Sequence, residues 1–307
     1  MTDILVIGES VADVIGQADG STVTHAGGSP ANVAFGLARL GVDTAFLTQL
    51  GSDADGALIR DHLIGAGVRV IEGEPVPSHT PRATAHIAPD GSATYEFAID
   101  WTLDTATDQP GAPTIPTAPH LHTGSIAAFL APGADAVLTL LAEARSGTSI
   151  SVDPNIRPAL MPDHAAAVAR FERLAAIADV VKASDEDLAW LYPETTDAGA
   201  AAHLVRLGAG LVVVTRGADG AYALTADREV QVPAVRTAVV DTVGAGDSFM
   251  SALLASLHGA GLLGRAGAMT DPLSAAALEQ HVTTAVRAAA ITVSRAGALP
   301  PTTAELG

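Results

Sequence analysis

The sequence predicts an α/β protein with a mostly parallel central sheet, helices on both faces of that sheet, and a small second sheet. Short apolar runs of strand type alternate with longer runs of helical type along most of the 307 residues, which is typical of a parallel sheet with right-handed crossovers. Two stretches, about residues 10–26 and 79–101, are polar and alternating instead. Strands buried on both faces read as continuous apolar runs, so we expect these two stretches to form an accessory sheet inserted in a single domain, residues 1–307.

In the first part of the chain, glycine and proline separate the expected elements. Ser29 is the expected N-cap of the first helix and Pro30 its N1 proline. The turn signal Pro89-Asp90-Gly91-Ser92 between two alternating strands predicts a hairpin. The expected elements are strands 3–8, 10–15 and 22–25, a helix that ends at Gly41, strand 43–50, a helix to about Gly65, strands 80–88 and 93–99, and a loop at 105–119.

The rest of the chain keeps the alternation of strand and helix. The expected elements are strand 121–123, helix 133–145, strand 149–152, helix 165–178, strand 180–182, helices 185–191 and 198–207, strand 211–215, a hairpin at 216–220, a strand-like run at 238–240, helix 248–258 and a long helix at about 274–294.

The composition excludes several classes of protein. The formal net charge of −18 argues against a nucleic-acid or anionic-membrane partner, and the absence of cysteine excludes disulfides and thiolate catalysis. No apolar run reaches the roughly 20 residues of a membrane span, so a soluble, cytoplasmic protein is expected. Lys182 is the only lysine and follows no Gly-x-x-x-x-Gly, which excludes a P-loop; no Gly-x-Gly-x-x-Gly follows the first strand, which argues against a dehydrogenase.

The stretch Asp241-Thr242-Val243-Gly244-Ala245-Gly246-Asp247-Ser248-Phe249 organises the chain. A glycine-rich turn that opens a helix presents several backbone N–H groups, which receive anionic oxygens. Asp247 beside such a site would repel a phosphate unless the carboxylate has a role, and the obvious role is to take a proton from a hydroxyl that attacks the phosphate. The alternative is that the glycines only make a tight turn and Asp247 favours the positive end of the helix.

Two further motifs suit a polyhydroxylated ligand, because ligands of open parallel sheets bind beyond the carboxyl ends of the strands. Gly27-Gly28 with Asn32 places closely approachable backbone beside an amide that donates and accepts hydrogen bonds. Asp13 lies on an apolar strand segment, where a carboxylate can accept two sugar hydroxyls. The alternatives are a plain helix start and a solvated edge-strand charge.

Three motifs suit a nucleotide and its metal ion. In Asp153-Pro154-Asn155-Ile156-Arg157-Pro158, Arg157 can neutralise a transferring phosphoryl group or hold a substrate oxygen, or the segment is an Asx-Pro turn. In Ser184-Asp185-Glu186-Asp187, the acids can hold Mg²⁺ through water, or Ser184 and Asp187 form a capping box. Thr215-Arg216-Gly217-Ala218-Asp219-Gly220 can lie along nucleotide phosphates or be a hairpin turn.

Together these motifs resemble the ribokinase-like (PfkB) carbohydrate kinases over essentially the whole chain. The resemblance depends on Gly27-Gly28-x-x-x-Asn32 with Gly41 and Gly51, on Asp153-x-Asn155-x-Arg157, on Thr215-x-Gly217-x-x-Gly220 and, most specifically, on Asp241-Thr242-x-Gly244-Ala245-Gly246-Asp247. It implies a three-layer α/β/α sandwich in which the accessory sheet is a lid. It also implies transfer of the γ-phosphate of ATP to a sugar hydroxyl, with Mg²⁺.

The resemblance also assigns roles to residues. Asp247 would be the catalytic base, and the amides of Gly244, Ala245 and Gly246 would stabilise the developing charge. The substrate-binding residues would be Asp13, Gly27, Gly28, Asn32 and Arg157. The nucleotide would lie along Ser184, Thr215, Gly217 and Gly220. Asp187 and Glu186 would hold Mg²⁺, while Asp241 and the Val243 carbonyl, with carbonyls near Arg295 and Gly297, match a monovalent-cation site in relatives, which leaves K⁺ open as an additional ion.

Within the family the chain looks most like fructokinases, on the grounds of Ile4-Leu5-Val6-Ile7-Gly8-Glu9, Tyr95-Glu96-Phe97, Asp100-Trp101 and the 153–158 motif. Tyr95, Phe97 and Trp101 would form an apolar wall for the sugar, or pack the lid or a homodimer through it. One departure matters, because the family's Asn-x-x-Glu appears as Ser184-x-x-Asp187. The alternatives are a 2-keto-3-deoxygluconate kinase, a ribokinase, a nucleoside kinase, and a sugar sensor with little turnover.

Overall fold

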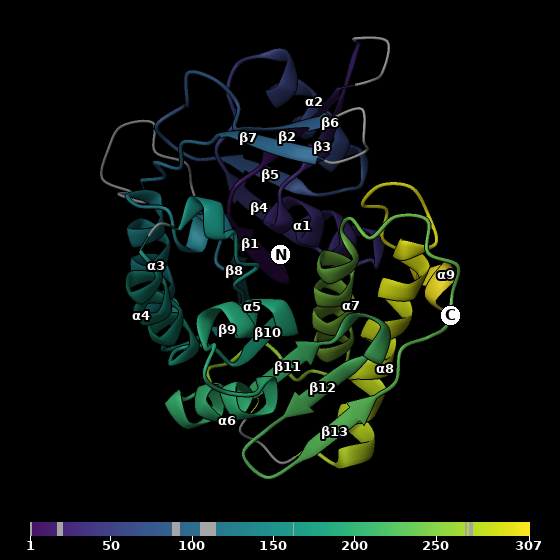
Figure 1. Cartoon of the computed structure of the whole chain (residues 1–307). Helices are drawn as coiled ribbons and strands as arrows, with labels where there is room; N and C mark the ends of the chain where they lie inside the picture. The colour runs from purple at the N-terminus through teal and green to yellow at the C-terminus, as the bar shows by residue number, and fades with distance from the viewer. Residues whose placement is uncertain are drawn as a thin grey trace.

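The computed structural model describes residues 2–16, 21–87, 93–104, 115–161, 163–267, 269 and 273–307. Within these residues the main sheet has nine strands in the order β13-β12-β11-β10-β9-β8-β1-β4-β5 (Figure 1). From β5 to β11 every neighbouring pair is parallel, and β12 and β13 join antiparallel. The strands are β1 Ile4–Ile7, β4 Thr44–Thr48, β5 Arg69–Glu72, β8 His120–Gly124, β9 Ser149–Asp153, β10 Val180–Ser184, β11 Leu211–Thr215, β12 Ala221–Leu224 and β13 Glu229–Val232.

Helices cover both faces of this sheet, and each face has its own apolar core. On one face pack α1 Ser29–Arg39, α2 Ala54–Gly65, α7 Ala245–Gly259 and α8 Ala275–Val293. On the other pack α3 Gly133–Ala144, α4 His164–Ala175, α5 Asp185–Leu191 and α6 Asp197–Leu207. Single-turn elements are η1 Ile126–Ala128, η2 Pro158–Leu160, η3 Gly217–Asp219 and α9 Thr303–Leu306. The predicted three-layer α/β/α sandwich is confirmed. No helix in the described ranges has the length and hydrophobicity needed to cross a bilayer.

The accessory sheet is a four-stranded lid at the top of the molecule in Figure 1. Its order is β3-β2-β6-β7, with β2 and β6 parallel and the outer pairs antiparallel. The strands are β2 Val11–Gly16, β3 Thr22–Gly27, β6 Arg82–Ile87 and β7 Ala93–Ala98. Two chain segments, one before and one after β4, α2 and β5, therefore build the lid together. The predicted turn at 89–92 and residues 105–114 of the predicted loop lie outside the described residues.

Three predictions of elements were wrong. Residues 238–240 form no strand, because the side chains of Val239 and Val240 are 65% and 64% exposed and this backbone joins no sheet; instead the Val240 amide donates to the Val293 carbonyl (2.8 Å). The edge strands β5 and β13 were not predicted, since each has only four residues and begins with an exposed charged residue, Arg69 in β5 and Glu229 in β13. Gly28 (φ 98°), and not Ser29, is the N-cap of α1.

Candidate active site

A cavity of about 330 Å³ lies beneath the lid, at the carboxyl ends of the parallel strands. Residues of β2, α1, the lid strands, the segment after β8, the 155–157 turn and the 242–247 loop line it. Among the predicted site residues, the structure brings together Asp13, Gly28, Asn32, Arg157, Val243 and residues 244–247. Segments far apart in the sequence thus converge where the fold class places its ligand.

Asp247 is the third residue of α7, is 9% exposed, and has both carboxylate oxygens hydrogen-bonded to α1. The Ser29 hydroxyl donates to Oδ1 (2.6 Å), and the Asn32 amide donates to Oδ2 (2.8 Å). Gly28, and not Ser29, is the N-cap of α1, and the Ser29 hydroxyl donates to Asp247 instead. The carboxylate has lone pairs left over for a group in the cavity.

The first turn of α7 is built to receive an anion. Gly244 is its N-cap, in the left-handed conformation (φ 73°), with no side-chain cap. A Cβ on Gly244 would stand 2.5 Å from the Cβ of Ala298, so only glycine fits. Within the described residues, the amides of Gly246 and Asp247 donate to no backbone carbonyl. Free amides at a helix N-terminus attract phosphate oxygens.

Two further carboxyl groups line the cavity, those of Asp13 and Glu9. Asp13 is half-buried and projects from β2 against Gly27, where a Cβ would stand 2.0 Å from Asp13 Oδ2. Burial raises the pKa of Asp13 to about 6, opposed by His25 on the paired strand and reinforced by Asp247. Glu9 is buried and accepts from the Ala127 amide (2.8 Å), and burial raises its pKa to about 7. At neutral pH Asp13 is therefore mostly ionised, whereas Glu9 is only partly ionised.

Arg157 lines the cavity but binds its own turn. Its Nη1 donates to the Asn155 carbonyl (3.2 Å), the Asn155 side-chain oxygen (2.9 Å) and the Ile156 carbonyl (3.0 Å). Asn155 holds this turn at a positive φ of 38°. Of the predicted apolar wall, Phe97 lines the cavity, whereas Trp101 is 1% exposed and packs against Gly133. The Tyr95 side chain lies outside the described residues.

The predicted nucleotide and Mg²⁺ residues lie at the start of α5 and the end of β11, outside the lining of the cavity. The capping box is present: the Asp187 amide donates to Ser184 Oγ (3.0 Å), and the Ser184 amide donates to Asp187 Oδ2 (2.9 Å). Asp187 Oδ1 accepts from the Ile156 amide (2.7 Å). Glu186 is exposed, and Ser184 pairs with Thr215 across the strands. The capping alternative is confirmed, and the metal role stays a prediction.

The other glycines predicted to bind the nucleotide bracket η3, directly after Thr215. Gly217 (φ 50°) has open space where a side chain would be, while Gly220 (φ 91°) packs against the Val232 carbonyl. Gly217 therefore leaves its backbone approachable, and Gly220 makes the turn into β12.

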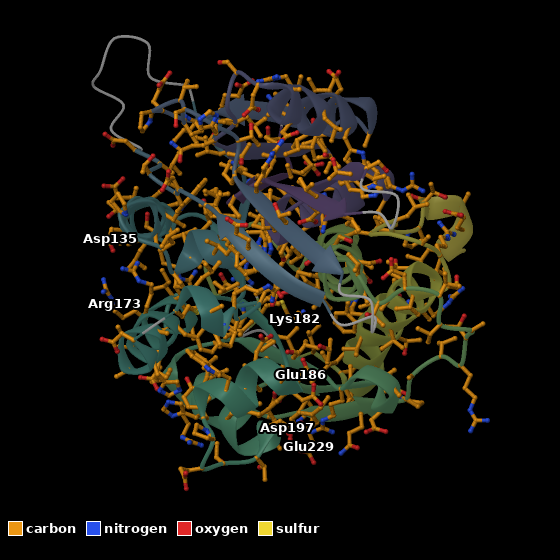
Figure 2. All side chains as sticks on the ribbon, turned by 45° about the horizontal axis from the view of Figure 1, so that its top comes forward. Asp135, Arg173, Lys182, Glu186, Asp197 and Glu229 are labelled. Atoms are coloured by element: carbon orange, nitrogen blue, oxygen red, sulfur yellow. The ribbon has the colours of Figure 1, made fainter. Side chains whose placement is uncertain are left out.

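Sequence reasoning missed Lys182 as a site residue. Its ammonium is 4% exposed and forms an ion pair with Asp153 (2.8 Å), and a Cβ on Gly246 would stand 3.0 Å from Nζ. Burial alone would lower the pKa of Lys182, but Asp153, Asp187 and Asp247 raise it above its ordinary value. A lone lysine in the apolar run 180–183 is a usable signal, because a buried charge needs a partner. Figure 2 labels Lys182, together with Glu186 on the neighbouring α5.

The predicted monovalent-cation residues belong to two linked loops. Asp241 accepts from the amides of Val243 (3.0 Å) and Gly297 (2.8 Å). This joins the loop before α7 to the turn after α8. In the described part of the chain, no three His, Asp or Glu side chains are grouped to hold a metal ion, so the ion sites stay predictions.

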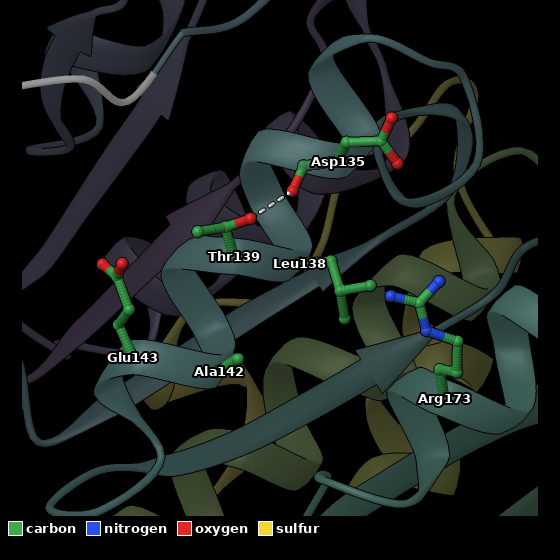
Figure 3. Close-up of a pocket in the computed structure, with 6 residues that line it drawn as sticks. All are labelled: Asp135, Leu138, Thr139, Ala142, Glu143 and Arg173. Atoms are coloured by element: carbon green, nitrogen blue, oxygen red, sulfur yellow. Dashed lines mark hydrogen bonds between the residues drawn. The ribbon is translucent and has the colours of Figure 1, made fainter.

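A second cavity, of about 570 Å³, is an open depression between α3 and α4 on the outer surface (Figure 3). It is lined by Asp135, Leu138, Thr139, Ala142, Glu143 and Arg173. None of the predicted site residues is among them, so the cavity under the lid is the candidate active site.

The fold and this site define a phosphotransferase of the ribokinase type, and comparison with known proteins agrees. The model of the pfkB family of carbohydrate kinases matches residues 1–305. The chain is 37% identical over 259 residues to a fructokinase of Rhizobium leguminosarum bv. trifolii (83% of this chain, 79% of the relative) and 32% identical over 299 residues to one of Salmonella typhimurium (96% and 94%). A fructokinase structure from Vibrio cholerae O395, with fructose, ADP and calcium ion bound, matches with a TM-score of 0.81 and 27% identity (100% and 98% covered). The protein therefore belongs to the pfkB family of carbohydrate kinases.

Proposed function

We propose that this protein is an ATP-dependent fructokinase. The observation that carries the proposal is that Asp247 and the free amides at the start of α7 face the same cavity as Asp13 and Asn32. A hydroxyl acceptor, a base and an anion site then lie within one enclosed space. The fructokinase relatives and the structure with fructose and ADP support the choice of substrate.

In the proposed reaction, Asp13 and Asn32 hold the sugar with one hydroxyl toward Asp247. The hydroxyl oxygen attacks the γ-phosphorus as its proton passes to Asp247. The bond from that phosphorus to the bridging oxygen of ADP breaks, and the sugar phosphate and ADP leave. The amides of Gly246 and Asp247 stabilise the charge on the transferring group, and lid closure excludes water.

A divalent ion, Mg²⁺ in this proposal, would neutralise phosphate charge. Both oxygens of Asp187 already accept backbone hydrogen bonds, which suits an ion that arrives with the nucleotide and is held through water by Glu186 and Asp187. Asp241 and the Val243 carbonyl would hold K⁺. A homodimer through the lid and a cytoplasmic location belong to the same proposal; the lid edges β3 and β7 offer backbone that a second copy can pair with.

The cavity favours an uncharged sugar over the sugar acid 2-keto-3-deoxygluconate. Three carboxyl groups line it, those of Glu9, Asp13 and Asp247. Arg157 is the only lysine or arginine among the described lining residues, and its guanidinium already binds its own turn. A substrate carboxylate would therefore meet repulsion from the ionised carboxylates, offset by one arginine that already binds its own turn through Nη1.

The test is coupled ADP release with Mg-ATP across fructose, ribose, 2-keto-3-deoxygluconate, adenosine and no acceptor, beside Asp247→Asn. Fructose-dependent turnover that the variant loses is the expected result. Turnover with only another acceptor would overturn the fructose assignment, and Mg-ATP and sugar binding without turnover would favour the sensor.

A further inference from the structure

We infer that the Ser29 hydroxyl is a positioning residue for the base, an inference that rests on the proposed role of Asp247. Ser29 Oγ lies 2.6 Å from Asp247 Oδ1, across 218 residues of sequence. A hydroxyl this close to a carboxylate makes a short, charge-assisted hydrogen bond.

The bond works together with that of Asn32. Ser29 is the first residue of α1, and Asn32 is three residues later, so both side chains lie on one face of the helix. Ser29 reaches Oδ1 and Asn32 reaches Oδ2. Two donors, one on each oxygen, fix the plane of the Asp247 carboxylate, whereas one donor leaves it free to turn.

The hydroxyl of Ser29 serves the neighbouring helix α7. Gly28 is the N-cap of α1, and the hydrogen bond found for the Ser29 side chain in the described part of the chain is the one to Asp247. A serine at the start of a helix ordinarily serves as a cap, so its hydroxyl is directed to Asp247 instead.

Helix packing keeps this pair in register. Farther along the same interface, a Cβ on Gly36 would stand 2.4 Å from Ser251 Oγ, so α1 and α7 approach closely. This close packing holds the N-terminal end of α1 against the first turn of α7. With the two helices fixed in place, the hydrogen bond from Ser29 sets the orientation of the Asp247 carboxylate.

The expected effect of Ser29→Ala is on the chemical step. A base whose carboxylate turns by a small angle loses the aligned geometry for proton transfer while substrates still bind. We expect kcat to fall about 10-fold, with KM for sugar and Mg-ATP within about twofold of wild type.

Ser29→Thr keeps the hydroxyl and should restore kcat. The matched control is Ser251→Ala, which removes a buried hydroxyl from the same helix interface, where it donates to the Ser248 carbonyl (3.0 Å); we expect wild-type kinetics. Unchanged kcat in Ser29→Ala would overturn the inference, as would a Thr variant as impaired as the Ala variant.

A crystal structure of Ser29→Ala separates this inference from the proposed function. A rotated or doubled Asp247 carboxylate in the variant supports positioning even if no sugar is turned over by the wild type. An Asp247 carboxylate in its original place, with Asn32 still bound, would overturn positioning even if the protein is a kinase.

Discussion

Helices α5 and α7 each carry an aspartate three residues after the N-cap, and the two aspartates have different partners. In α5, Asp187 turns back onto the amide of its own cap, Ser184. In α7 the cap is Gly244, and Asp247 reaches across to Ser29 and Asn32 on α1. Lys182 lies near both carboxylates.

The difference shows that the side chain of the N-cap decides the role of the acid in the first turn. The Ser184 hydroxyl accepts a hydrogen bond from the Asp187 amide, and the Ser184 amide donates one to the Asp187 carboxylate. These hydrogen-bonding groups at the start of α5 therefore satisfy one another. Gly244 offers no side chain, so the amides of Gly246 and Asp247 remain for a ligand, and the Asp247 carboxylate is bound by α1 instead of by its own cap. A glycine N-cap costs only a few tenths of a kcal/mol relative to serine, so the open amides come at a small cost in helix stability.

The largest expected effect is that of Asp247→Asn. Loss of the base should lower kcat about 10³-fold with nucleotide binding retained. Coupled ADP release and calorimetric titration of Mg-ATP measure the two. Asp187→Asn, at the same helix position, is the matched comparison at saturating Mg²⁺: Asp187 would hold the ion but takes no proton from the sugar, so kcat should stay within about threefold of wild type. Equal losses of kcat in the two variants would contradict the different roles of Asp247 and Asp187.

Lys182→Met should lower the free energy of unfolding by about 3 kcal/mol, because it leaves the buried Asp153 carboxylate unpaired. Urea denaturation followed by circular dichroism measures it. The double variant Lys182→Met/Asp153→Asn should recover part of the loss. A loss under about 1 kcal/mol in the single variant would contradict a buried ion pair between the neighbouring strands β9 and β10.

Gly244→Ser places a potential cap on α7. The residue needs φ 73°, and its Cβ would press against Ala298. The first turn should shift and kcat should fall about 10²-fold, the effect of losing one oxyanion donor. Steady-state kinetics measure this, with Gly261→Ser at the far end of α7 as the control, because Gly261 also has a positive φ (70°) but open space around it. A fully active Gly244→Ser enzyme would show that glycine is not required.

Asp187→Asn should cost about 1.5 kcal/mol of stability, because its carboxylate accepts from Ser184 and Ile156 and an amide offers only one acceptor atom. Thermal and urea unfolding measure the loss. A rise in the Mg²⁺ concentration needed for half-maximal turnover would support the proposed role of Asp187 in holding the ion through water, and an unchanged stability would contradict the contribution of its capping-box hydrogen bonds.

The smallest expected effect concerns sugar binding and pH. Burial raises the pKa of Asp13 to about 6. Asp13 is ionised above that value, so sugar affinity should fall as the pH drops below about 6. Asp247 adds to this shift, so Asp247→Asn should move the affinity midpoint down by a few tenths of a pH unit, while Asp187→Asn should not. Calorimetric titration with fructose at several pH values measures the midpoint. Equal midpoints in the wild type, Asp247→Asn and Asp187→Asn would show that the charge of Asp247 does not affect the pKa of Asp13.

Local patterns predicted the parts of this molecule that depend on neighbouring residues. The turn and helix start at 244–247 and the capping box at 184–187 are contiguous, so the sequence contains the whole of each structure. A local rule for N-caps predicted that the Ser29 side chain would cap α1. Its hydroxyl instead donates to Asp247, 218 residues away, a tertiary contact that a local rule cannot predict. The run 238–240 has strand propensity and no neighbouring strand to pair with. Lys182 and Asp153 come from adjacent strands, and only the register of β9 and β10 brings them together.

The burial of Lys182 has a consequence for the chemical reactivity of the protein. It is the only lysine, and its side chain is 4% exposed. Aside from the terminal amine, the folded surface offers nothing to an acylating or amine-crosslinking reagent. Acylation of Lys182 requires the sheet to separate from α7. The rate of acylation therefore reports the rate at which the protein opens or unfolds, and it can be measured without an engineered label.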